Sequence, residues 1–383
     1  MKKILIVAPY CSLPGEPNFN RFLYIYLILS KIYDVTLVTS DFRHFDKKHR
    51  DLNLDYAINV AFIHEPGYKS NVSLSRIVSH KVFTNNFSKW LDKNFDFDLV
   101  YSAYPLIETN IILANLKKKY DFKLVIDVQD IWPESISSAF PVINKLDQNL
   151  LPFTKKANKA YSSADAIIAV SNQYLNRAIS VNANVPSETI FIGSDFDLIN
   201  MAKADCKDNS IFKLIYIGTL SYSYDVKTII LAINEMVKIG LPIEFHIFGS
   251  GEFENELKKI ASQAVIFHGF VELSKVFSFM KSSDVAVNAL SSSAKQSVTN
   301  KFSDFMSIGI PILNSQKSEE ILELLDTIDH ENYEAGNVES AMDKIMSFYN
   351  RRNTLKFSPN EKFNREVEYV KIVNMIDGLI NEI

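Results

Sequence analysis

Residues 297–315, with the sequence SVTNKFSDFMSIGIPILNS, contain signals for a helix start, a helix end and a buried strand. Thr299 or Asn300 can accept the free amide hydrogens of the first helical turn, and Gly309 suits the left-handed position after the last turn. The proline two residues later prevents the helix from continuing, and the apolar run at residues 310–313 is typical of a strand buried on both faces. The stretch therefore predicts a helix followed by a buried parallel strand, as in an α/β fold.

The amino end of this helix is electropositive, because its first amide groups have no partners within the helix and the helix dipole adds to them. Such an end is a ready phosphate site, and Lys301 in the first turn adds a full positive charge. Asp304 lies one turn deeper, where a carboxylate would repel phosphate but could accept hydrogen bonds from sugar hydroxyls. We therefore predict a nucleoside diphosphate clamp formed by Thr299, Asn300, Lys301 and Asp304. An ordinary capped helix and strand is the alternative.

The same segment resembles the nucleotide-binding signature of family 4 glycosyltransferases, which are retaining enzymes of the GT-B fold. That signature has a Glu, seven residues, a second Glu near the head of this helix, and then Gly-x-Pro before a strand. Its two Glu positions fall on Gln296 and Asp304. The resemblance implies that Asp304 holds the ribose hydroxyls of the donor. Gln296 is neither a nucleophile nor a base at neutral pH, which excludes a covalent sugar intermediate there, although its amide can bind a sugar hydroxyl.

The resemblance also implies the fold class, an α/β protein of the GT-B type with two Rossmann-like domains whose parallel sheets face a central cleft. A chain of 383 residues is longer than one core usually fills, which independently favours two domains. We expect an acceptor-binding domain at residues 1–195 and a nucleotide-sugar-binding domain at residues 196–360. By the same resemblance, a C-terminal helix at residues 361–383 returns to the first domain.

The composition narrows the class of protein. A hydrophobic fraction of 47% with 22% charged residues is typical of a globular protein, and a net charge of −4 argues against a nucleic-acid binder. The two cysteines, Cys11 and Cys206, match neither a disulfide framework nor a metal site, and we expect no metal and no cofactor. No signal peptide precedes the first predicted strand, so we expect a cytoplasmic protein.

The opening of the chain, residues 3–39, predicts a strand, a helix and a second strand, as in a Rossmann-like unit. The loop at residues 9–20 holds a single glycine, so it lacks the fingerprint of a dinucleotide site. In the resembling family this loop commonly carries a Gly-Gly pair that approaches the donor phosphate and the acceptor. Asn18 and Arg21 are our acceptor candidates here, and a solvated loop is the alternative.

Residues 127–135, DVQDIWPES, follow a strong predicted strand, and ligands of open α/β sheets gather beyond the carboxyl ends of strands. The run resembles one in a subgroup of family 4 enzymes that build bacterial surface polysaccharides, except that Gln129 stands where a His is common. Asp127 and Trp132 are acceptor candidates, since the Trp132 ring offers a flat face for a sugar. Asp130 is the candidate catalytic contact to the reacting sugar or the acceptor hydroxyl, with helix capping as the alternative.

Two loops in the second half follow predicted strands and contain glycines. The first holds Gly218 and Thr219, and the second holds Gly249 and Gly251. We predict that these four residues contact the donor, because glycine lets a backbone approach a flat nucleobase; a plain strand-to-helix turn is the alternative. The resembling family places an Arg directly after the first glycine and a Lys a few residues later, where this chain has Thr219 and Tyr224. The diphosphate clamp would therefore use fewer cations.

Two further patterns carry alternatives. The Asp-x-Asp sequences at residues 96–98 and 195–197 spell the metal motif of GT-A transferases, but the first of them precedes a strand, whereas the motif needs the carboxyl end of one. We expect neither to bind a metal. The predicted amphipathic helix at residues 76–95, with Lys81 and Lys89, suits either anionic lipid or an ordinary surface position.

These observations predict a metal-independent, retaining glycosyltransferase that uses a nucleoside diphosphate sugar, expected to be a UDP-sugar. The resemblance implies a lipid-linked saccharide acceptor, a role in surface polysaccharide assembly, and a cytoplasmic protein resting on the inner membrane. One alternative is a catalytically inactive homologue that acts as a partner subunit, because the charged or basic side chains of the resembling family are replaced in this chain by Gln129, Thr219, Tyr224 and Gln296. A sugar-nucleotide epimerase would share the two-domain architecture.

Overall fold

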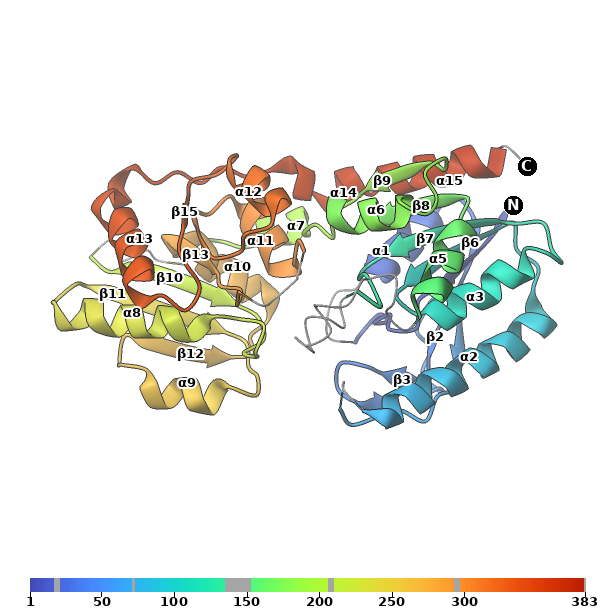
Figure 1. The fold of residues 1–383 in the computed structure, drawn as a ribbon, viewed down its shortest axis with the longest axis horizontal. Coiled ribbons are helices and arrows are strands. Elements are labelled where there is room, and N and C mark those ends of the chain that lie inside the picture. Colours follow the sequence, from blue (N-terminus) through green and yellow to red (C-terminus); the bar gives the residue numbers. More distant parts are fainter. Residues whose placement is uncertain (17–20, 71–72, 135–152, 206–209, 293–296, 382–383) are drawn as a thin grey trace. The chain divides into compact units, whose positions relative to one another are not determined.

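The computed structural model describes residues 1–16, 21–70, 73–134, 153–205, 210–292 and 297–381 (Figure 1). The chain divides into two compact units, the first formed by Met1–Ile190 with Tyr369–Ile383 and the second by Phe191–Glu368. Each unit contains one large parallel sheet with helices packed against it. Among the described helices, none is both long and apolar enough to cross a bilayer.

The sheet of the first unit has seven parallel strands in the order β5-β2-β1-β6-β7-β8-β9. The strands are β1 (Lys3–Val7), β2 (Asp34–Ser40), β5 (Val60–Ile63), β6 (Leu99–Tyr104), β7 (Lys123–Val128), β8 (Ala166–Ala169) and β9 (Ser187–Thr189). The interior strand β1 is apolar from Ile4 to Val7, and these four residues are completely buried. Such a run suits a parallel strand that is covered on both faces.

Helices of the first unit include one from the far end of the chain. They are α1 (Arg21–Leu29), α2 (Leu74–Asn94), α3 (Ile107–Leu116), α5 (Thr154–Ser162), α6 (Asn172–Ile179) and α15 (Val370–Asn381), and a hairpin of β3 (Phe42–Arg43) and β4 (Lys48–His49) follows β2. Ile25 of α1 and Ile376 of α15 are fully buried in the same hydrophobic core. The predicted strand-helix-strand opening is confirmed as β1, α1 and β2.

The second unit has six parallel strands in the order β12-β11-β10-β13-β14-β15. The strands are β10 (Phe212–Ile217), β11 (Ile243–Phe248), β12 (Val265–Gly269), β13 (Val285–Asn288), β14 (Ile312–Asn314) and β15 (His330–Asn332). The helices are α7 (Phe196–Met201), α8 (Val226–Lys238), α9 (Glu254–Ile260), α10 (Leu273–Ser282), α11 (Asn300–Ile308), α12 (Glu319–Leu325), α13 (Val338–Asn350) and α14 (Arg365–Glu368), with short 3₁₀ turns at Arg352–Thr354 and Glu361–Phe363.

Helix α11 and strand β14 confirm the prediction for residues 297–315. Thr299 is the N-cap, and its side chain accepts a hydrogen bond from the Phe302 amide. Gly309 ends the helix in the left-handed region with φ +74°, and a Cβ there would lie 2.2 Å from the Pro359 nitrogen. Glycine is therefore needed at this position both for its backbone conformation and for the chain segment that packs against it.

The two glycine-containing loops pack directly against each other. Gly249 has φ +127°, and a Cβ on it would lie 2.0 Å from the Gly218 carbonyl oxygen. A Cβ on Gly251 would lie 2.2 Å from the carbonyl oxygen of Leu220, whose amide donates a 3.0 Å hydrogen bond to the carbonyl of Ser250. Close approach of two backbones thus explains both glycines, and their predicted contact with a nucleobase stays a prediction.

We expect Gly249→Ala to destabilise the protein by more than about 2 kcal/mol, because the new Cβ meets backbone and the φ angle is unfavourable for alanine. Gly378→Ala is the control, since no atom lies within 4 Å of its Cβ position in helix α15. It should raise stability by up to about 1 kcal/mol. Urea unfolding of both variants measures the difference, and equal midpoints would contradict the close packing of the two loops.

Candidate functional site

The amino end of α11 and the loop after β10 lie together at the carboxyl edge of the second sheet, and Lys301 connects them. Its Nζ lies 3.6 Å from the ring centroid of Tyr224 and 4.5 Å from that of Tyr216. It also donates a 3.4 Å hydrogen bond to the Tyr216 hydroxyl. Two aromatic faces attract an ammonium group through their negative electrostatic potential. The lysine predicted from the sequence therefore reaches the strand that carries the first glycine-containing loop.

The ammonium group of Lys301 is buried without a carboxylate partner among the described residues. The residue is 6% exposed, and burial lowers the pKa of Lys301 well below its usual range. A buried charge is costly unless it is paired, and tyrosine rings compensate only part of its lost hydration. The arrangement is therefore suited to an anion that supplies the missing counter-charge.

A ladder of asparagines ends the three neighbouring strands β13, β14 and β15. Asn288, Asn314 and Asn332 are register partners, and each side-chain amide donates to the next side-chain oxygen at 2.8 and 2.7 Å. The Gln316 side chain extends this ladder. Its oxygen accepts a hydrogen bond from the Asn288 amide at 3.3 Å, and its amide donates to the Ser297 carbonyl, just before α11, at 3.4 Å. The Asn288 Oδ1 atom is buried with no hydrogen-bond partner among the described residues.

The sequence analysis missed this ladder. Asn314 was assigned only as the residue after a buried strand, and nothing in the linear pattern pairs it with Asn288 or Asn332. A polar residue at the carboxyl end of each of several consecutive strands is the signal that could have found it, because these ends share one edge of a parallel sheet.

Asp304 lies one turn into α11 and is only partly exposed. The Ser194 hydroxyl donates a hydrogen bond to its Oδ1 atom. Burial raises the pKa of Asp304 to about 6, against the opposing effects of the Ser194 hydrogen bond and the Arg365 charge. The predicted contact with ribose hydroxyls would therefore use the carboxylate oxygen that Ser194 does not bind.

Asp304 should give the protein a distinctive pH dependence. The carboxyl group ionises near pH 3.8 in the unfolded chain and near pH 6 in the folded one, so the folded state holds the extra proton between these values. The free energy of unfolding should then fall as the pH rises from about 4 to about 6, by at most about 1.4 kcal/mol per pH unit. Urea unfolding across this range should show a flatter profile for Asp304→Asn. The exposed Asp326→Asn is the control, and a profile unchanged by Asp304→Asn would contradict the assignment.

The other predicted donor contacts are arranged around Lys301. The sequence predicts two roles for Thr299, as the cap of this helix and as a donor contact. The structure shows the first, because the Thr299 hydroxyl caps α11. Asn300 is exposed at the first position of the helix, and Thr219 is exposed in the loop after β10, where its carbonyl accepts a 2.9 Å hydrogen bond from Tyr216. Gln296 lies outside the described residues. Asn300, Thr219 and Lys301 thus stand at one sheet edge, and their contact with a donor stays a prediction.

In the first unit, Arg21 and Asp127 form a buried ion pair. The Nε atom of Arg21 donates to Asp127 Oδ2 at 2.7 Å, and the residues are 3% and 0% exposed. The Tyr101 hydroxyl donates to the same carboxylate at 2.6 Å. Arg21 also donates to the Ile190 carbonyl at 2.8 Å and to the Tyr369 hydroxyl at 3.1 Å. Burial disfavours the charge on Arg21, but the Asp127 carboxylate outweighs it and raises the pKa of Arg21.

This pairing corrects the expectation that Arg21 and Asp127 face an acceptor. The sequence placed Asp127 at the end of its strand, whereas β7 continues to Val128, so Asp127 is still inside the sheet and its side chain lies under α1. The ion pair joins α1 and β7 to Ile190 and to Tyr369, where the chain re-enters the first unit. Asn18, the other candidate from this region, lies outside the described residues.

The loop after β7 keeps two of the predicted acceptor-side residues at the surface. Trp132 is 37% exposed, and its carbonyl accepts a hydrogen bond from the Tyr104 hydroxyl. Asp130 is partly exposed in the same loop. The loop is anchored by Glu134, which is buried and paired with Arg177. Asp130 and Trp132 therefore remain candidates for acceptor contacts.

One carboxylate of each Asp-x-Asp sequence accepts a hydrogen bond from a backbone amide. Asp98 accepts a 2.8 Å hydrogen bond from the Lys3 amide and a 3.1 Å hydrogen bond from the Lys2 side chain. Asp195 is the N-cap of α7 and accepts a 2.9 Å hydrogen bond from the Leu198 amide. These contacts give each sequence a structural role.

No protein-family model matches this chain, and no curated protein matches it in sequence. Solved structures do match it along its whole length. Sucrose-phosphate synthase from Thermosynechococcus elongatus is similar at a TM-score of 0.70 with 12% identity, covering 100% of both chains. HepE from Anabaena in complex with UDP is similar at a TM-score of 0.67 with 15% identity, covering 99% of this chain and 100% of that one. The chain has the GT-B fold. The predicted α/β class with two parallel-sheet units is confirmed.

A protein described with another activity has a similar fold. A putative UDP-N-acetylglucosamine 2-epimerase from Listeria monocytogenes is similar at a TM-score of 0.59 with 10% identity, covering 98% of this chain and 97% of that one. Identities this low establish the fold alone. The function must therefore be argued from the site.

Proposed function

We propose that this protein is a retaining, family 4-type glycosyltransferase that moves a sugar from a nucleoside diphosphate donor, a UDP-sugar, to a lipid-linked saccharide in surface polysaccharide assembly. The observation that carries the proposal is the buried ammonium group of Lys301, which lacks a carboxylate partner among the described residues and sits in the first turn of α11. The structures of HepE with UDP and with UDP-glucose share this fold and support the choice of donor.

Lys301 would act on the leaving group. A bound diphosphate would supply the counter-charge that the two tyrosine rings lack, and the first amide groups of α11 would add hydrogen bonds. As the bond between sugar and phosphate breaks, negative charge grows on the departing diphosphate, and a fixed buried cation stabilises that charge more than water does. The ribose would bind Asp304.

Retention of configuration would follow from attack on the face that the diphosphate leaves. Gln296 offers no carboxylate for a covalent intermediate, so a donor phosphate oxygen would take the proton of the acceptor hydroxyl. The positive charge of Lys301 would serve where other transferases use a metal ion. Asp130 and Trp132 would contact the acceptor from the first unit.

Binding of nucleoside diphosphates to Lys301→Met tests the donor clamp. Thermal unfolding in EDTA should show that one nucleoside diphosphate, uridine diphosphate by our proposal, raises the melting temperature of the natural protein, because a ligand that binds only the folded state stabilises it. Loss of one charged hydrogen bond should weaken that binding about 10- to 100-fold in Lys301→Met. The variant should fold, since an apolar side chain of similar shape replaces a desolvated charge.

Lys258→Met is the matched control, because Lys258 lies in the same unit but is exposed and paired with Glu254. Equal affinity in Lys301→Met and the natural protein would refute the clamp. No shift with any diphosphate would favour the inactive partner subunit. Formation of an epimer from the UDP-sugar without acceptor would favour the epimerase.

The exposed apolar residues at the start of α2 support the lipid-linked acceptor. Leu74, Ile77 and Val78 are 81%, 65% and 56% exposed, and Lys81 follows on the same helical face. The buried residues of α2 form a separate face: Phe83, Phe87 and Leu91. Apolar side chains beside a lysine suit insertion at the surface of an anionic bilayer. A transferase with such a contact would meet its acceptor in the membrane plane.

Sedimentation with lipid vesicles tests this contact. We expect the natural protein to bind vesicles that contain phosphatidylglycerol, and Ile77→Gln with Val78→Gln to lose most of that binding. Ile239→Gln, at a residue that is 66% exposed in the second unit, is the control. Equal sedimentation of the double variant and the natural protein would contradict a membrane role for α2.

A further inference from the structure

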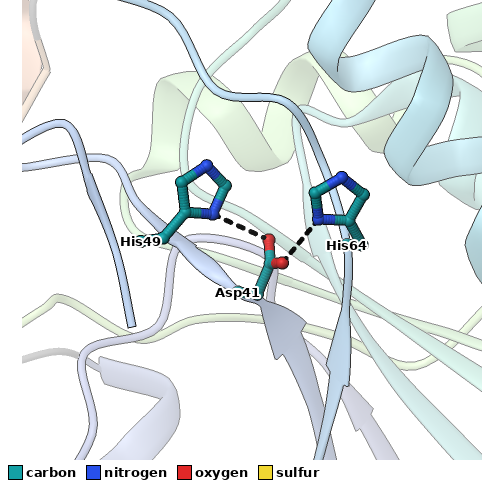
Figure 2. Close-up of side chains that lie close together, drawn as sticks. All are labelled: Asp41, His49 and His64. Atoms are coloured by element: carbon teal, nitrogen blue, oxygen red, sulfur yellow. Dashed lines mark hydrogen bonds and ion pairs between the residues drawn. The ribbon is translucent and has the colours of Figure 1, made fainter. Parts of the chain in front are cut away.

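Three side chains with metal-binding atoms meet in the first unit, on three separate segments within residues 41–64. Asp41 follows β2, His49 belongs to the short strand β4, and His64 follows β5 (Figure 2). The Nδ1 atoms of His49 and His64 lie 3.5 and 2.7 Å from the two carboxylate oxygens of Asp41. One ligand atom from each residue lies within 4.8 Å of the others. These separations allow a single ion to contact all three with small side-chain rotations.

The backbone around the three residues is fixed by hydrogen bonds between their segments. The Asp41 amide donates to the Ile63 carbonyl at 3.0 Å, and the Arg50 amide donates to the Asp41 carbonyl at 2.8 Å. The backbone of Asp41 is thus hydrogen-bonded to Ile63, which precedes His64, and to Arg50, which follows His49. A ligand set held by paired backbone segments loses little conformational entropy when it binds an ion.

Neighbouring backbone groups orient Asp41 and His49, whereas the Nδ1 atom of His64 donates a hydrogen bond to Asp41 that an ion would replace. The Glu65 amide donates to Asp41 Oδ1 at 3.1 Å, which fixes the carboxylate. The Nε2 atom of His49 lies 3.4 Å from the Pro66 carbonyl oxygen, a contact that places its proton on Nε2 and leaves the Nδ1 lone pair free toward Asp41. Metal-binding histidines typically donate their other ring nitrogen to a carbonyl or carboxylate.

We propose that Asp41, His49 and His64 bind a divalent transition-metal ion of the zinc class. Two imidazoles and one carboxylate suit Zn²⁺ and its neighbours, whereas Mg²⁺ and Ca²⁺ require oxygen ligands. The histidine side chains are 45% and 63% exposed, so the ion would reach the site from solvent and keep at least one position for water. The buried Asp41 carboxylate would provide the negative charge.

The ion would join three connections at the carboxyl edge of the first sheet. It would tie the end of β2 to the β3–β4 hairpin and to the end of β5, which in the structure are linked by hydrogen bonds and by the stacked rings of His49 and His64. The site belongs to the first unit, whereas Lys301 belongs to the second, so the proposal does not depend on the proposed transferase function.

Titration of chelator-treated, tag-free protein with Co²⁺ tests the site. We expect one Co²⁺ per chain, visible as d–d absorption bands that Zn²⁺ removes by competition, and a higher melting temperature with Zn²⁺ but not with Mg²⁺. His64→Ala should weaken binding by at least about 10- to 100-fold, the loss that even a neighbour of a ligand typically causes. His330→Ala in the second unit should bind like the natural protein.

Asp41→Asn provides a second test. It should weaken Co²⁺ binding to a similar extent, because an amide oxygen carries no charge. Circular dichroism would establish that both ligand variants are folded. Absence of bands in the natural protein would overturn the proposal and leave a hydrogen-bonded cluster, and so would binding that survives in both His64→Ala and Asp41→Asn.

Discussion

The desolvation of Lys301 constrains much of the second unit. A primary ammonium in a buried position must be compensated, and the structure does this with the faces of Tyr216 and Tyr224 and with one hydroxyl. Both tyrosines belong to β10 or the loop that follows it, so the compensation depends on how α11 packs against that strand. That packing in turn depends on Gly309, where the chain stops the helix and lets the 358–360 segment cross it.

Tyr224 stands at a position where the resembling family has a cation, and its ring packs against the Lys301 ammonium group. Where the resembling family has a lysine a few residues after the glycine of this loop, this chain has a tyrosine whose ring centroid lies 3.6 Å from the Lys301 Nζ atom. A lysine there would bring a second positive charge into the same buried space, and like charges in low dielectric repel strongly. One cation with two aromatic neighbours is a different solution from two or three clustered cations. The proposed enzyme would then bind its diphosphate with one buried charge and the amides of α11.

The first unit also buries a cation, Arg21, but there a carboxylate neutralises the charge. Arg21 is as deeply buried as Lys301, but Asp127 neutralises it, and the pair has no charge left to offer a ligand. Buried ion pairs contribute little net stability because both groups lose hydration, yet removing one partner is strongly destabilising. The pair also bonds Ile190 and Tyr369, residues at the two points where the chain leaves and re-enters this unit. Burial alone therefore does not mark a binding residue, and our proposal rests instead on the lack of a carboxylate partner for Lys301 among the described residues.

The sequence by itself determined the secondary structure of residues 297–315 and placed a lysine in the first turn of α11. The spacing of apolar residues, the Thr299 cap and Gly309 are local signals, so helix α11 and strand β14 were predictable, and Lys301 in the first turn followed from them. Only the tertiary structure decided which charges are paired. Arg21 and Asp127 are 106 residues apart, and Asp41, His49 and His64 come from three separate strands or their ends. Such contacts depend on strand order and register, which local periodicity does not encode.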